Sequence, residues 1–115
     1  YFADGENWIY VAEIDGEIEG FLSVEVHREE RNNYIYYDDF CVSEKYRFKG
    51  IGSALMNEAE KYCKDIGFST IVLHVEEDNI TARKFYEKNG FVITANRRSI
   101  DRGKGFVQVQ YELKK

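Results

Sequence analysis

The stretch RFKGIGSAL, residues 47–55, has the residue types and spacing of a site that binds an anion. Gly50 and Gly52 lie one residue apart, directly before an apolar run with helical spacing. The first turn of a helix has unpaired backbone N–H groups and a partial positive charge, and glycines let a phosphate approach them closely. A turn that needs glycines only for its own geometry is the competing interpretation, and the loop alone leaves both open.

Two common nucleotide-binding loops can be excluded. A P-loop ends in Gly-Lys-Ser/Thr, whereas this loop ends in Gly52-Ser53-Ala54 without a lysine. The dinucleotide-binding fingerprint has a third glycine where this chain has Leu55. An anion-binding loop of another kind remains.

Two residues further along the chain have side chains that can exchange protons. Tyr86 falls in a short apolar-periodic segment, and a phenol of pKa ~10 can donate a proton to a strong base. His74 falls in a compact β-forming run, and an imidazole of pKa ~6.5 suits a base at neutral pH. Each also has a structural interpretation: a tyrosine packing a helix on a sheet, and a strand histidine with satisfied hydrogen bonds.

Composition limits the class of protein. The chain has 115 residues, 43% of them hydrophobic, which fits one globular domain. The net charge of −5 argues against a nucleic-acid partner, and no apolar run approaches the ~20 residues of a membrane span. No signal peptide is recognisable, and two cysteines with two histidines are too few for a disulfide framework or a metal site. We therefore expect a cytoplasmic protein without a metal.

Hydrophobic periodicity predicts the secondary structure. Alternating or β-rich runs indicate strands over 8–14, 20–28, 34–42, 69–75, 91–98 and 105–113. Spacings of three and four predict helices over 51–66 and 79–88, each followed by a glycine. Asp15-Gly16 is typical of a hairpin turn, so the first three strands form an antiparallel meander.

The order of these elements predicts the fold class, α/β (mixed α+β). Strand, glycine loop, helix and strand from 34 to 75 form a β-α-β unit with parallel strands. We expect a mixed, mostly antiparallel sheet of about six strands with one such crossover and helices on both faces. Ligands gather at the carboxyl ends of the parallel strands, here Val42 and Val75.

Two motifs resemble a known family. VSEKYRFKGIGSAL resembles the acyl-CoA-binding motif of the GNAT-type N-acetyltransferases, Arg/Gln-x-x-Gly-x-Gly/Ala after a strand. LHVEEDNITARKFYEKNGF, residues 73–91, resembles the family's second signature, a strand followed by Asn, a small residue, Tyr and Gly-Phe. The resemblance spans residues 8–113 and implies a single GNAT-like domain over 1–115. It also implies transfer of an acetyl group from acetyl-CoA to a primary amine of a small molecule or peptide.

The resemblance assigns coenzyme A to the glycine loop and to the strand before it. Main-chain groups of Phe40 and Val42 would pair with the pantetheine arm like an added strand. Backbone amides of the loop would hold the pyrophosphate. The loop residues are Arg47, Phe48, Lys49, Gly50, Ile51, Gly52 and Ser53.

The second motif implies contacts nearer the reacting atoms. Asn79 and Ala82 would line the pantetheine arm, and Tyr86 would face the thioester sulfur and protonate the departing thiolate. Asn79 and Tyr86 are seven residues apart, hence on one helix face and about 10 Å apart along its axis. That separation suits two contacts along one extended ligand.

The acceptor amine must lose a proton before it attacks, because an ammonium has no lone pair. Holding an amine of pKa ~10.4 neutral at pH 7 costs about 4–5 kcal/mol, so a base or water relay is needed. In protein N-terminal acetyltransferases, residues matching His74 and Tyr36 relay this proton through water. In polyamine acetyltransferases a glutamate stands at the place of Glu77, which is the alternative base.

The sequence departs from the family in two places. Phe48 stands where the family commonly has glycine, so a positive φ there would strain it. The family also has a strand and two helices before the segment WIYVAEI, which this sequence lacks, so the domain is expected to be N-terminally incomplete. The exposed sheet edge that results could be covered in a homodimer. A CoA-binding or regulatory module without catalysis, and an interaction domain without a ligand, remain alternatives.

Overall fold

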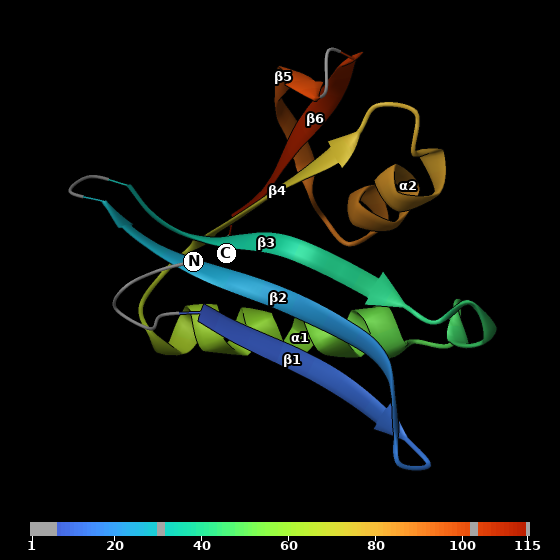
Figure 1. The fold of residues 1–115 in the computed structure, drawn as a ribbon. Coiled ribbons are helices and arrows are strands. Elements are labelled where there is room, and N and C mark those ends of the chain that lie inside the picture. Colours follow the sequence, from blue (N-terminus) through green and yellow to red (C-terminus); the bar gives the residue numbers. More distant parts are fainter. Residues whose placement is uncertain (1–6, 30–31, 102–103, 115) are drawn as a thin grey trace.

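The computed structural model describes residues 7–29, 32–101 and 104–114. A six-stranded sheet carries two α-helices and one 3-10 turn. Helix α1 runs along β1, β2 and β3, and α2 lies beside β4 and β6 (Figure 1). The elements are β1 Asn7–Ile14, β2 Glu17–Glu29, β3 Asn32–Val42, η1 Glu44–Tyr46, α1 Ile51–Asp65, β4 Thr70–Glu76, α2 Ile80–Lys88, β5 Val92–Asp101 and β6 Lys104–Lys114.

The strand order is β1-β2-β3-β4-β6-β5, with β3 and β4 parallel and every other neighbouring pair antiparallel. The predicted fold class is confirmed: a mixed, mostly antiparallel sheet with one adjacent parallel crossover. Asp15 and Gly16 both have positive φ, 53° and 83°, as a two-residue hairpin with the twist of its strands requires. The predicted turn over 101–105 lies partly outside the described residues.

The helices occupy one face of the sheet rather than the two faces that the sequence predicted. Buried side chains of both helices join a single core cluster with those of the strands, among them Met56, Tyr86, Leu73 and Tyr111. The connections β3-α1-β4 and β4-α2-β5 cross the sheet in the same direction. Crossover connections between parallel strands are right-handed. Two connections that run across the sheet in the same direction therefore place their helices on the same face. The opposite face is left for polar and half-buried side chains.

Strand β3 carries a bulge where it leaves β4. Leu22 pairs with Phe40 but Val24 pairs with Tyr37, so β3 has one extra residue at Asp38-Asp39. Pairing with β4 ends at Tyr37 opposite Leu73, although β3 continues to residue 42 and β4 to residue 76. The two strands diverge from there (Figure 1). Within the described residues, the edge of 38–42 that faces β4 therefore has no strand partner.

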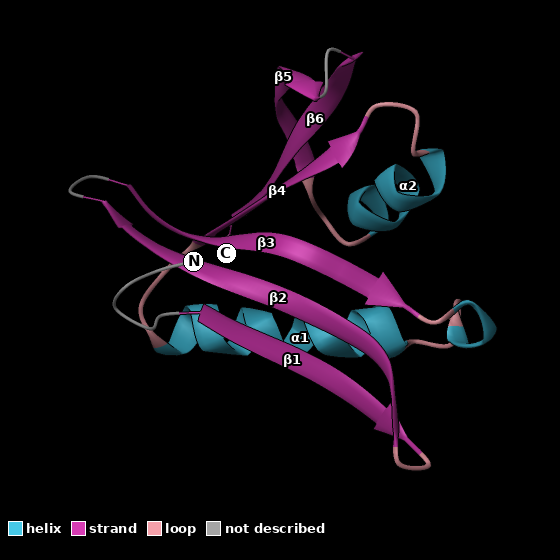
Figure 2. Ribbon diagram, viewed as in Figure 1, coloured by secondary structure: helices cyan, strands magenta, loops and turns pink. Residues whose placement is uncertain are grey.

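Both helices begin beyond the carboxyl ends of the diverging strands (Figure 2). Helix α1 starts after the glycine loop that follows β3, and three residues separate the end of β4 from the start of α2. Gly67 and Gly90, with φ of 81° and 94°, allow the left-handed turns that end them. The bulge, the gap and two helix N-termini thus share one end of the parallel pair.

Candidate active site

The start of α1 has the properties of an anion site. Gly50, with φ of 84°, is its N-cap and provides no side-chain hydrogen bond. The first intrahelical bond runs from the Ala54 amide to the Gly50 carbonyl, so the amides of residues 51–53 point out of the helix. The first turn contains no acidic residue, and Arg47 and Lys49 beside it are exposed. An unpaired helix N-terminus flanked by cations favours a phosphate group.

The structure gives a packing reason for glycine at position 52, beside the close ligand approach that the sequence suggested. A Cβ on residue 52 would lie 3.2 Å from the Phe85 Cζ and 3.4 Å from the Phe40 Cζ. The missing side chain therefore makes room for α2 to pack against the start of α1. Gly50 is the open position, because a Cβ there would have no other atom within 4 Å. Close helix packing at Gly52 and a left-handed turn at Gly50 explain why both positions are glycine.

Phe48 is strained, as the sequence predicted for a positive φ. Its φ is 62°, and its side chain is 94% exposed. A left-handed backbone costs a residue with a Cβ about 1–2 kcal/mol, and an exposed side chain returns little packing energy. The loop therefore reaches the α1 start in a conformation that its own sequence disfavours.

We expect Phe48→Gly to raise the free energy of unfolding by about 1 kcal/mol, because glycine adopts this φ without steric cost. Urea denaturation measures the change. Phe48→Ala is the matched control: it removes the ring but keeps the Cβ, so it should not be stabilised. A loss of stability in Phe48→Gly would mean that the ring makes a contact worth more than the strain.

Tyr86 lies on the core face at the gap between β3 and β4. It is 8% exposed, and its ring centroid is 6.2 Å from that of Phe40 and 5.6 Å from that of Phe91. Burial raises the pKa of Tyr86 to about 12. The hydroxyl thus stays protonated at neutral pH, which is the state a proton donor needs.

Tyr36 and His74 meet on the opposite face, on neighbouring strands where the gap begins. The Tyr36 Oη lies 2.8 Å from the His74 Nδ1, although the two residues are 38 positions apart. The His74 Nε2 lies 3.2 Å from the Gln110 Oε1. These side chains line a cavity of about 220 Å³, whose walls are Asn32, Tyr34, Tyr36, Thr70, Val72, His74, Gln110 and Glu112.

Glu77 is not part of this cavity. It follows β4 directly, is exposed, and its carbonyl accepts a 2.8 Å hydrogen bond from the Arg83 guanidinium. Asp38 at the bulge is also exposed, and its pKa is raised by partial burial and by the neighbouring carboxylates of Glu25 and Asp39. The structure therefore groups His74 with Tyr36 and leaves Glu77 apart from them.

The remaining candidates lie on β3 and at the start of α2, beyond the point where the pairing of β3 with β4 ends. Asn79 is the N-cap of α2: its Oδ1 accepts a 3.2 Å hydrogen bond from the Ala82 amide, which explains an asparagine there without a ligand. Phe40 packs on Phe85 at 6.0 Å between ring centroids. The Val42 carbonyl accepts a 3.2 Å bond from the Arg47 Nε, which draws this cation toward the end of β3.

Gln110 is the site residue that sequence reasoning missed. It pairs with His74 across the antiparallel strands β4 and β6. The alternation of polar residues 108, 110 and 112 in β6 marks a polar face, but only the strand order places that face beside His74. Among the described residues no group of His, Cys, Asp and Glu has the arrangement of a metal site, and no described helix is long and apolar enough to span a membrane.

Three features define this site: parallel strands that diverge, a helix start without a side-chain cap, and a buried tyrosine nearby. Comparison with known proteins agrees with them. A sequence model of the acetyltransferase (GNAT) family matches residues 1–91. The chain therefore belongs to the acetyltransferase (GNAT) family. The family membership predicted from the two sequence motifs is confirmed.

Two curated relatives show the range of that family. Streptothricin acetyltransferase A of Bacillus subtilis is 38% identical over 64 residues, which cover 56% of this chain and 37% of that protein. The L-amino acid N-acetyltransferase AaaT of Escherichia coli is 36% identical over 84 residues, covering 72% of this chain and 52% of that protein. The chain thus matches about half or less of each relative's length.

Solved structures share the fold over nearly the whole chain. A putative streptothricin acetyltransferase from Bacillus anthracis, in complex with acetyl coenzyme A, has a TM-score of 0.85 and 30% identity, covering 100% of this chain and 66% of that one. Nourseothricin acetyltransferase has a TM-score of 0.86 at 23% identity, covering 96% and 66%. The fold is therefore that of the acetyltransferases, including one with acetyl-CoA bound.

Proposed function

We propose that this protein transfers the acetyl group of acetyl-CoA to a primary amine by direct attack. One observation carries the proposal: β3 leaves β4 at a bulge, and the gap is flanked by the unpaired amides of α1 and by Tyr86. In this proposal the extended thioester lies along the edge of 38–42, and its anionic end lies at the start of α1. Family membership and the acetyl-CoA complex of a 30% identical relative support it.

Binding follows from the backbone. The amides of residues 51–53, with Arg47 and Lys49 nearby, hold the diphosphate of acetyl-CoA. The edge of 38–42 without a strand partner bonds the pantetheine amides as an added strand would. Ala82, half-buried on α2, borders the arm, and Asn79 caps the first turn of α2 next to it.

The two proton transfers, from the acceptor ammonium and to the departing thiolate, take place on opposite faces of the sheet. On the open face, Tyr36 and His74 take the proton that the acceptor ammonium must lose, through water or directly. The amine nitrogen then attacks the thioester carbon, and the carbon–sulfur bond breaks. The nitrogen loses its second proton to water, and a proton from water restores the Tyr86 hydroxyl after Tyr86 has protonated the sulfur. On the core face, Tyr86 gives its proton to the departing thiolate. The gap between β3 and β4 is where these two faces meet.

Several acceptors fit this chemistry. The cavity beside Tyr36 has polar and aromatic walls and one carboxylate, that of Glu112. Relatives include proteins named for streptothricin and for L-amino acids, so these amines are the first to test. A cytoplasmic location, where acetyl-CoA is made available, fits the cysteine usage. A homodimer that covers the β1 edge is part of the same proposal.

Calorimetric titration with acetyl-CoA tests binding, and release of free thiol tests turnover. We expect saturable binding and a thiol-release rate that depends on streptothricin, an L-amino acid, spermidine or an N-terminal peptide. Desulfo-CoA, which binds without reacting, is the control for binding. Binding without turnover on any amine would indicate a CoA-binding regulatory module. No heat of binding would contradict the proposal at its first step.

A further inference from the structure

We propose that Gln110 is a positioning residue that holds His74 as the tautomer with its proton on Nε2, so that Nδ1 accepts the Tyr36 hydroxyl proton. The inference rests on the proposed function for its catalytic meaning. Its structural part, the tautomer of His74, can be measured without any activity. Three contacts of the Gln110 side chain carry it.

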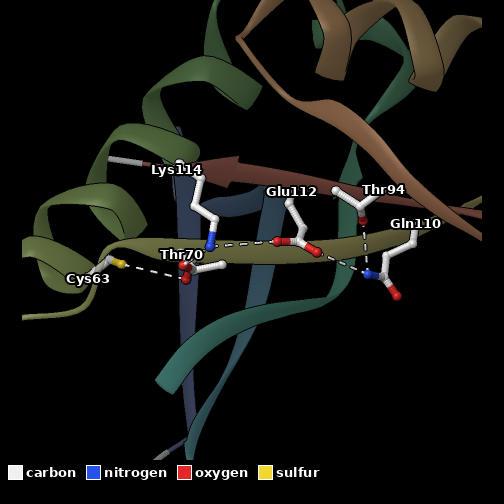
Figure 3. Close-up of polar contacts among 6 residues, drawn as sticks. All are labelled: Cys63, Thr70, Thr94, Gln110, Glu112 and Lys114. Atoms are coloured by element: carbon white, nitrogen blue, oxygen red, sulfur yellow. Dashed lines mark hydrogen bonds and ion pairs between the residues drawn. The ribbon is translucent and has the colours of Figure 1, made fainter. Parts of the chain in front are cut away.

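The first step is the orientation of the Gln110 amide. Its Nε2 lies 3.2 Å from the Glu112 Oε2 and 3.0 Å from the Thr94 Oγ1. A carboxylate only accepts hydrogen bonds, so the NH2 end of the amide must face Glu112. Figure 3 shows Gln110 held between Thr94 of β5 and Glu112 of its own strand. The amide oxygen is thereby turned away from both.

The Gln110 amide oxygen in turn determines which ring nitrogen of His74 carries the proton. The Gln110 Oε1 lies 3.2 Å from the His74 Nε2, and an amide oxygen can only accept. The proton of a neutral imidazole must then be on Nε2, which leaves a lone pair on Nδ1. The Tyr36 hydroxyl, 2.8 Å from Nδ1, is therefore the donor in that bond. A neighbour that bonds one ring nitrogen decides the role of the other.

The third step is the direction of the relay. Tyr36 releases its proton to Nδ1, and its oxygen then takes a proton from the acceptor ammonium, directly or through water. His74 becomes an imidazolium that keeps its Nε2–H bond to Gln110. No proton is lost or gained: one leaves the ammonium and one arrives at Nδ1. The other tautomer would present an N–H to Tyr36 and could not start this sequence.

The anchoring of Gln110 continues along β6. Glu112 lies 4.0 Å from the Lys114 ammonium, which donates a 3.0 Å bond to the Thr70 Oγ1 on β4 (Figure 3). Strands β4, β5 and β6 are thus tied by side chains on the open face as well as by their backbone bonds. Because this row of contacts restrains Glu112, it also restrains the Gln110 amide.

Nitrogen-15 NMR of the imidazole rings tests the inference. The chain has only two histidines, and a His27→Gln variant assigns the His74 signals. We expect the Nε2–H tautomer in the wild type and a mixture of tautomers in Gln110→Leu, with kcat about 10-fold lower and KM for acetyl-CoA unchanged. Gln108→Leu, on the same face of β6 two residues earlier, should match the wild type in both measurements.

A double variant tests whether another oxygen acceptor at position 110 restores the His74 tautomer and kcat. Gln110→Glu with Glu112→Gln exchanges amide and carboxylate, so the net charge is unchanged and an oxygen still accepts from Nε2. We expect the Nε2–H tautomer and most of kcat to return. An Nδ1–H tautomer in the wild type, or a Gln110→Leu variant with wild-type tautomer and kcat, overturns the inference. An inactive wild type whose Nε2–H tautomer becomes a mixture in Gln110→Leu would instead contradict the proposed function and confirm the positioning by Gln110.

Discussion

Ser53→Glu is expected to weaken acetyl-CoA binding about 100-fold while making the folded protein slightly more stable. Ser53 is the third residue of α1, in the first turn that has no acidic residue. A glutamate there complements the helix dipole, which stabilises a helix by about 0.3–1 kcal/mol. In the proposed complex it would also face the diphosphate, and two unit charges about 6 Å apart repel by about 2.8 kcal/mol at an effective dielectric constant of about 20. Calorimetry measures the affinity, and thermal denaturation the stability.

Three comparisons isolate the charge at the helix start. Ser53→Gln has the same shape without the charge and should bind nearly as well as the wild type. Asn57→Glu places the charge on an exposed position of α1 one turn further on and should have a small effect. Acetyl-pantetheine, which lacks the diphosphate, should bind Ser53→Glu and the wild type equally. Equal affinity of Ser53→Glu and the wild type for acetyl-CoA itself would rule out the start of α1 as the diphosphate site.

Tyr86→Phe is expected to lower kcat by about 100-fold, the lower range of general acid catalysis, with KM for acetyl-CoA nearly unchanged. The phenylalanine keeps the ring contacts to Phe40 and Phe91, so the thermal midpoint should move little. Because the pKa of Tyr86 is about 12, its deprotonation should not limit the rate below about pH 11. Steady-state kinetics from pH 6 to about 10 tests both statements.

Tyr37→Phe is the matched control for Tyr86→Phe. Tyr37 lies in the same core, 6.2 Å from the Phe91 ring, and burial raises the pKa of its hydroxyl too. Its buried hydroxyl has no hydrogen-bond partner within the described part of the chain. Removing it should leave kcat unchanged and cost no stability, since an unpaired buried hydroxyl is unfavourable. Full activity in Tyr86→Phe would assign protonation of the sulfur to water or to another residue.

Local sequence patterns predicted the features that depend on neighbouring residues, such as the change from strand to helix and the backbone of the glycine loop. The period of hydrophobic residues changes after residue 42, and the structure has a strand before that point and a helix after it. The positive φ at Phe48 follows from the loop pattern, because a backbone turn depends on a few adjacent residues. Tyr86 was predicted on a short helix after the second parallel strand, and it lies on α2, which follows β4.

Other parts could not be predicted, because they depend on how distant segments pack. The bulge at Asp38-Asp39 exists only relative to the register of β2, so no residue pattern in β3 alone marks it. The packing of Phe85 against Gly52 could not be predicted, because the two residues are 33 positions apart in the sequence. The shared face of α1 and α2 depends on β5 lying beyond β4 on the side away from β3, so that both connections cross the sheet in the same direction.

The sequence by itself determined the family, the order of strands and helices, and the loop that begins α1, since each depends on residues close together in the chain. Only the tertiary structure decided which proton-transfer groups meet. Tyr36, His74 and Gln110 come from three strands, and they are neighbours because β3, β4 and β6 are adjacent in the sheet. Strand order follows from burying the whole apolar face at once, so it is decided by the chain as a whole and not by any one segment.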